Sequence, residues 1–233
     1  MKKVCLAFLA FVSTALVSAN GWASANLSEV ELKWLRAAEP VLVFAKAQGL
    51  SIDIAIKPQS EPGDVPLAMG VRGGHCKLLL SMRGNPNAEA TLTNAPVGQQ
   101  ALLIEAMAAH EVAHCWRYAH GVWHALPAGF VERQDVGDNT ELAKQIQQMR
   151  VARREEGYAD LLALAWTSWR HAPEYSDVYA WLERIRGEAP LGGGYHDTRV
   201  WLRLAKHAAT ITSSKNLFQQ VQNLWMEGLR SEE

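Results

Sequence analysis

The feature that most constrains this chain is a long stretch of helical periodicity, Pro96–His120, which contains the sequence His-Glu-Val-Ala-His. Residues four apart lie on one side of a helix, one turn apart, so the imidazoles of His110 and His114 face the same way. Two histidines in this arrangement can bind one zinc ion. Glu111 lies about 100° further round the helix, where it is better placed to accept a proton than to bind the metal. The helix therefore offers two zinc ligands and a candidate general base.

A catalytic zinc usually has three protein ligands, and two residues compete to be the third. His120 lies six residues beyond His114, which is the spacing of the third histidine in metzincins. The glycine that turns the chain back to the metal in that pattern is replaced here by Arg117. If the helix continues straight, His120 lies about 9 Å along its axis from His114 and cannot share the metal.

The other candidate for the third ligand lies further along the chain, in a second predicted helix. Glu156 and Asp160 are four residues apart in this helix and share a face. Glu156 can complete a site of two histidines and one glutamate, and Asp160 can accept the free N–H of one ligand imidazole. Glu155 is expected to point to another side of the helix.

With these residues the chain resembles the gluzincin zinc metallopeptidases, of which thermolysin is the familiar member. The stretch Arg153-x-x-Glu156-x-x-Ala159-Asp160 is similar to a motif of the gluzincins related to membrane CAAX-processing peptidases. The resemblance covers roughly residues 75–205 and implies a zincin-like fold, a Zn²⁺ cofactor and a peptide or protein substrate. It implies that Glu156 binds zinc, that Asp160 orients a ligand, and that Glu111 accepts the proton of the attacking water.

A loop near the C-terminal end offers a group for the oxyanion that forms when a carbonyl is attacked. Gluzincins bring a histidine or tyrosine from a later segment over the metal, and by this resemblance His196 is the first candidate and Tyr195 the second. The alternative is a loop histidine at the start of a helix. The strand Cys76–Met82 is either the sheet edge that binds an extended peptide or an ordinary core strand.

The first 25 residues are predicted to be a signal peptide. They contain two lysines at positions 2 and 3, the apolar run Val4–Val17, and the small residues Ala23-Ser24-Ala25. We therefore expect export to the periplasm or outside the cell, and no stable membrane insertion after the segment is removed. An uncleaved anchor is the alternative. In an oxidising compartment Cys76 and Cys115 are expected to form a disulfide that ties a strand to the motif helix, the alternative being two buried thiols.

The order of the predicted elements defines an α+β chain. Residues 26–233 are expected to form one domain, with the sheet and active-site helix over about 50–121 and a helical lobe over about 138–230. Strands are predicted at 51–57, 67–72 and 76–82, and helices at 27–48, 96–120, 138–170, 175–187 and 197–229.

The charge of the chain argues against a nucleic-acid partner, because the formal net charge is −1 and no block of like charges occurs. Two other functions stay open from the sequence alone. One is a metzincin-like peptidase that uses His120. The other is a non-catalytic exported module with a structural zinc, in which Cys115 or His120 is the fourth ligand. The preferred peptide, the regulation and the oligomeric state cannot be predicted.

Overall fold

A computed structural model describes residues 27–61, 63–92, 95, 98–132, 141–187, 194–207, 211 and 216–232. The predicted signal peptide lies outside these residues. The helices and strands are, in chain order, α1 (Glu29–Ala47), β1 (Ile52–Ile56), β2 (Leu67–Arg72), β3 (His75–Leu80), α2 (Asn87–Ala90), α3 (Gln100–Ala119), α4 (Glu141–Arg170), the 3₁₀ turn η1 (Ala172–Glu174), α5 (Tyr175–Gly187), α6 (Arg199–Leu204) and α7 (Leu217–Glu232).

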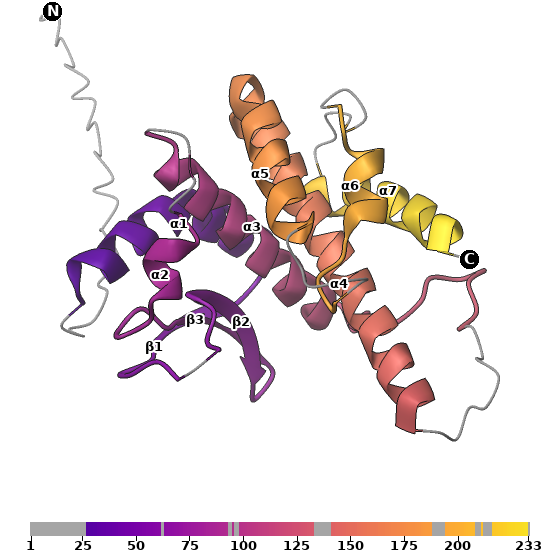
Figure 1. The fold of residues 1–233 in the computed structure, drawn as a ribbon, viewed down its shortest axis with the longest axis horizontal. Coiled ribbons are helices and arrows are strands. Elements are labelled where there is room, and N and C mark those ends of the chain that lie inside the picture. Colours follow the sequence, from indigo (N-terminus) through magenta and orange to yellow (C-terminus); the bar gives the residue numbers. More distant parts are fainter. Residues whose placement is uncertain are drawn as a thin grey trace, which may run out of the picture.

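The predicted α+β class is confirmed. Figure 1 shows the three strands together with α1 and α2 at one end of the molecule, the helices α4 to α7 at the other end, and α3 between them. Helix α3 packs against α1, β2 and β3 on one side and against α4 on the other. In the part of the chain that the structure describes, no helix is long and apolar enough to cross a bilayer.

The sheet has the strand order β1-β3-β2. Strand β3 pairs in parallel with β1 and antiparallel with β2, so it is the central strand. The edge-strand interpretation of Cys76–Met82 is therefore wrong, and β2 is the edge next to the motif helix. The pairing of β2 with β3 follows from the short turn at Gly73-Gly74, where both residues have positive φ, as the tight turn of a hairpin requires.

Helix α3 is buried along most of its length, including both motif histidines and the apolar residues around them. It ends at Ala119, and Gly121, just beyond the C-cap His120, has a φ of +67°. The N–H of Gly121 donates to the carbonyl of Tyr118, and the N–H of Val122 donates to the carbonyl of Arg117. These two bonds form a Schellman motif, for which glycine is the preferred residue.

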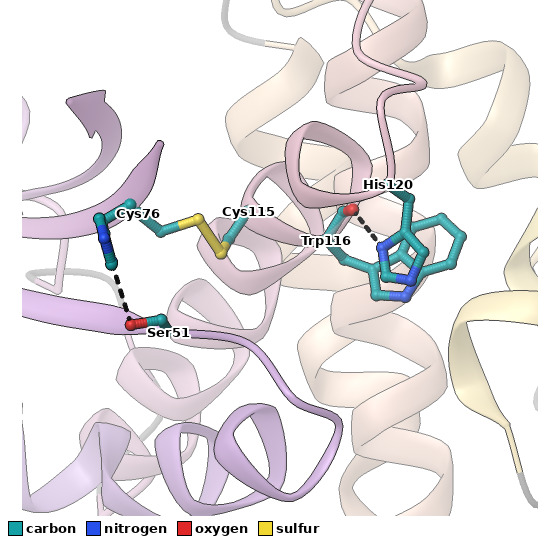
Figure 2. Close-up of a disulfide and its surroundings, with 6 residues drawn as sticks. Ser51, Cys76, Cys115, Trp116 and His120 are labelled. Carbon is teal, nitrogen blue, oxygen red and sulfur yellow. Dashed lines mark hydrogen bonds between the residues drawn. A yellow bond between two sulfur atoms is a disulfide. The ribbon is translucent and has the colours of Figure 1, made fainter. Parts of the chain in front are cut away.

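Cys76 and Cys115 form a disulfide, as expected for the two cysteines of an exported chain. Figure 2 shows that it joins the strand to the helix. Both residues are almost completely buried. The covalent link therefore fixes α3 to the sheet at the residue that follows His114.

Replacing both cysteines with alanine is expected to lower the free energy of unfolding by about 4 kcal/mol. The bond closes a loop of sequence separation 39, and the loss of loop entropy in the unfolded chain gives this magnitude. Urea unfolding of the variant and of the wild type measures the difference. Wild type unfolded in the presence of a reductant should match the variant, and identical midpoints for the oxidised wild type and the variant would contradict the expectation.

The predicted extent of the last helix is wrong. Instead of a single helix over 197–229, the structure contains α6 and α7, which pack against each other. The indole of Trp201 lies against Gly157 of α4 and Gly228 of α7, where a side chain at either glycine would overlap it. Its N–H donates to the carbonyl of Trp225. Two parts of one straight helix could not make these contacts, so the burial of Trp201 requires the chain to fold back.

Candidate metal centre

Three side chains from two helices converge at the side of α3 that faces α4. The Nε2 atoms of His110 and His114 lie 3.1 Å apart. One carboxylate oxygen of Glu156 lies 3.4 Å from His110 Nε2, and the other lies 3.4 Å from His114 Nε2. The two histidines are buried and Glu156 is largely so. These residues could hold a metal ion, and they are the three that the sequence motifs predict.

The spacing of the three donor groups suits zinc. Nitrogen and oxygen ligands lie about 2.0–2.2 Å from zinc in tetrahedral sites, which places neighbouring ligand atoms about 3.3–3.5 Å from one another. The observed separations of 3.1, 3.4 and 3.4 Å are close to this value. The donor set is also one that zinc prefers, with two imidazole nitrogens and a carboxylate.

Asp160 fixes the orientation of His110 from behind. Its Oδ1 lies 2.9 Å from His110 Nδ1, and the carboxylate also accepts hydrogen bonds from Arg186 and from the Thr198 hydroxyl. Burial disfavours its charge, but the Arg186 guanidinium and the bond from His110 outweigh this and hold the pKa of Asp160 well below its usual range. An ionised Asp160 can only accept, so His110 carries a proton on Nδ1 and turns Nε2 toward the other ligands.

The charges around His110 favour a cation at its Nε2. Burial opposes a positive ring, but the charge of Glu156 and the hydrogen bond to Asp160 prevail and raise the pKa of His110 to about 10. The Glu156 carboxylate is also buried, and the two histidines nevertheless hold its pKa well below the usual range. The same anionic surroundings that stabilise a proton at this nitrogen would stabilise a metal ion.

Glu111 lies beside this group without belonging to it, as its place on the helix predicts. Its side chain is half-buried and lines the same cleft. Burial raises the pKa of Glu111, while the two histidines and the backbone of Met69 in β2 partly offset that rise. Glu111 is thus a carboxylate that gains a proton more readily than an exposed glutamate does, next to a candidate metal site.

The site opens into a cleft of about 420 Å³. One wall is the edge strand β2 with the residues before it, and the opposite wall is α5. The residues that line the cleft besides the candidate ligands and Glu111 are Val65, Pro66, Leu67, Ala68, Met69, Thr91, Ala106, Met107, Trp123, Ala163, Trp181, Leu182, Ile185, Arg186 and His196. The walls are mainly apolar, and most of the charged groups gather at the three candidate ligands.

The two candidate oxyanion residues are placed differently. His196 lines the cleft, and its Nε2 lies 3.8 Å from a carboxylate oxygen of Glu156. Its side chain is 60% exposed, so the imidazole can reach a molecule bound in the cleft. Tyr195 is also exposed but does not line the cleft.

His120 lies apart from the candidate metal site. Its ring stacks on Trp116 with a centroid distance of 4.2 Å, and its Nδ1 donates to the carbonyl of Trp116 (Figure 2). Helix α3 continues straight as far as Ala119, as expected when the glycine that would turn the chain is absent. Cys115 is not available as a fourth ligand either, because its sulfur is in the disulfide.

Three residues near the site were not predicted from the sequence. Arg186 and Thr198 bind Asp160, and Trp123 packs against His114. No spacing rule links them to the motifs, because each comes from a separate segment that tertiary packing brings to the site. Thr198 falls inside the helix predicted over 197–229, whereas in the structure it directly precedes α6.

No protein-family model matches the chain, and comparisons with curated proteins and with solved structures likewise give no match. The candidate function therefore depends on the residues of the site themselves.

Proposed function

We propose that this protein is an exported zinc-dependent hydrolase, and specifically a peptidase of the gluzincin type. The observation that carries the proposal is the convergence of His110, His114 and Glu156 at zinc-ligand spacing with Glu111 beside them in an open cleft. A structural zinc usually has four protein ligands, whereas a catalytic one has three and an open position. Among the described residues the cluster has three members, and it faces the cleft.

In this proposal His110, His114 and Glu156 hold the zinc ion, and Asp160 orients His110. Zinc in such a site acts as a Lewis acid that polarises a carbonyl and lowers the pKa of water. Glu111 accepts the proton of the attacking water and then delivers it to the leaving amine. Its raised pKa suits both transfers, because a group that both gains and loses a proton works best near the ambient pH.

The cleft is suited to an extended peptide. Edge strands bind extended peptides by adding a further strand, and β2 borders the cleft along residues 67–69. His196 is the candidate to stabilise the negative oxygen of the tetrahedral intermediate, since it is exposed and lies next to Glu156. Tyr195 is the second candidate, and it would have to move to reach the cleft.

The disulfide supports export, because such bonds persist mainly in oxidising compartments such as the periplasm or the extracellular space. Together with the predicted signal peptide at residues 1–25, it favours a protein that acts outside the cytoplasm.

The experiment that tests the proposal measures metal content and hydrolysis in the same preparation. The purified mature protein is expected to contain about one zinc ion per chain and to cleave members of a mixed peptide library. Removal of the metal with a chelator should stop cleavage, and added zinc should restore it. Cleavage that continues in metal-free protein would contradict the proposal, as would zinc-loaded protein that cleaves no peptide.

A further inference from the structure

The two candidate ligand histidines are held in different ways. His110 is fixed by the hydrogen bond from its Nδ1 to Asp160. The Nδ1 atom of His114 is buried and has no hydrogen-bond partner among the residues that the structure describes. The torsion that turns an imidazole ring is broad, so a ring without a hydrogen bond at this position depends on packing for its orientation.

A second ring that packs against His114, besides that of His110, is Trp123. The indole meets the His114 ring edge to face, with a centroid distance of 5.4 Å and an interplanar angle of 84°. The His110 ring also meets His114 edge to face, at 4.8 Å and 87°. His114 therefore makes edge contacts with two rings, and Trp123 is the one of the two that is not a metal ligand.

Trp123 belongs to a loop that buried charges hold in place. Arg117 donates from Nη2 to the carbonyls of Val122 and Ala125, and Glu155 accepts from the backbone N–H of His124. Arg117 and Glu155 are themselves paired, with Nε 2.5 Å and Nη2 3.0 Å from the carboxylate. Both members of the pair are almost completely buried. The ion pair thus fixes the backbone on both sides of Trp123.

The backbone of this loop is also conformationally constrained. His124 has a φ of +61°, in the left-handed region that residues other than glycine rarely adopt. Such a conformation persists only where the surroundings enforce it, and here the residue's own N–H is bound to Glu155. Position 123 is therefore held by a defined backbone rather than by a loosely attached loop.

We propose that Trp123 is a positioning residue for His114, and that it does by ring packing what Asp160 does for His110 by a hydrogen bond. The inference rests on the proposed function, because it assumes that His114 binds the metal. In this proposal Arg117 and Glu155 hold the loop that carries Trp123. Trp123 is 37% exposed at the rim of the cleft, so its replacement should disturb His114 more than it disturbs the core.

The test compares zinc affinity, measured by competition with a chromophoric chelator, in Trp123→Ala, Trp123→Phe and the wild type. The alanine variant is expected to bind zinc about two- to tenfold more weakly, the loss expected for one aromatic contact. Phenylalanine keeps a ring edge near His114 and should restore most of the affinity. With cobalt in place of zinc, the visible absorption bands should shift in the alanine variant, because the ligand geometry changes.

Trp169→Ala is the matched control. Trp169 is also a partly exposed tryptophan, but it packs against Phe44 and Trp166 near the C-terminal end of α4 and does not line the cleft. This variant should bind zinc as the wild type does and give the same cobalt spectrum. A loss in Trp169→Ala equal to that in Trp123→Ala would overturn the inference, since it would reveal a general effect of losing a tryptophan.

Three further outcomes also bear on the proposals. Wild-type affinity and an unchanged cobalt spectrum in Trp123→Ala would overturn the positioning role. A wild-type protein that binds no zinc would overturn both this role and the proposed function, whereas zinc binding without peptide cleavage would contradict the proposed function alone and leave the comparison of affinities valid.

Discussion

Glu111→Gln is expected to reduce peptide cleavage about 10²–10⁴-fold, which is the usual contribution of a general base. Glutamine has the size of glutamate but cannot accept the proton of water. Glu111 lies outside the three candidate ligands, so the variant should contain as much zinc as the wild type. The measurement is the initial rate of cleavage of the best library peptide, with metal content determined on the same sample.

Glu105→Gln is the control on the same helix. Glu105 lies outside the cleft, where its Oε1 accepts from the Trp166 indole and its Oε2 lies 3.1 Å from His171 Nε2. A glutamine there can still accept the indole hydrogen bond, so cleavage should remain near the wild-type rate. If Glu111→Gln kept most of its activity, the proposed mechanism would be wrong even with zinc present.

Glu156→Ala is expected to weaken zinc binding strongly. The loss of a residue that only hydrogen-bonds to a metal ligand costs about 10–100-fold in affinity, and the loss of a ligand itself should cost more. The variant removes one of three donor groups and the negative charge that favours a cation at His110. The measurement is the zinc dissociation constant, obtained by chelator competition. Cleavage at subsaturating zinc should fall in parallel.

His120→Ala is the matched control for this prediction and separates the two peptidase classes considered for the chain. His120 contacts Trp116 instead of the candidate ligands, so its removal should leave zinc affinity unchanged. The opposite result, with tight binding in Glu156→Ala and weak binding in His120→Ala, would favour a metzincin-like site and reject the glutamate ligand.

The two pairs of candidate site residues could be predicted from helical spacing, and their meeting at one site was implied by the resemblance to gluzincins. His110 with His114, and Glu156 with Asp160, are each four residues apart, and that spacing fixes a shared face without knowledge of the tertiary fold. Arg117 in place of glycine argued against a turn of the chain after His114, and α3 runs on to Ala119. The shared face of each pair needed only the geometry of one helix at a time.

The residues that support the site could not be predicted in this way. Arg186 reaches Asp160 because α5 packs on α4, and Glu155 pairs with Arg117 because α3 and α4 cross at that level. The sequence suggested only that Glu155 points away from Glu156. Which side chain it would meet depends on how two helices pack, and no local spacing encodes that.

The sheet shows the same limit. The strands predicted at 51–57, 67–72 and 76–82 match β1, β2 and β3 of the described residues to within a few positions. The order of the strands in the sheet was not predictable from the sequence patterns that located them. Strand β1 pairs with β3, although β2 lies between them in the chain, and hydrophobic alternation does not determine which strand is central.

The contact of Trp201 with Gly157 has a consequence for how this protein can change during evolution. Gly157 directly follows Glu156, so the surface of α4 beside a candidate ligand is shaped to accept an indole from a segment more than forty residues further along the chain. The orientation of α4 about its axis, which points Glu156 toward the two histidines, therefore depends on its contacts with α6 and α7. Substitutions at positions 157, 201 and 228 should therefore arise together or not at all.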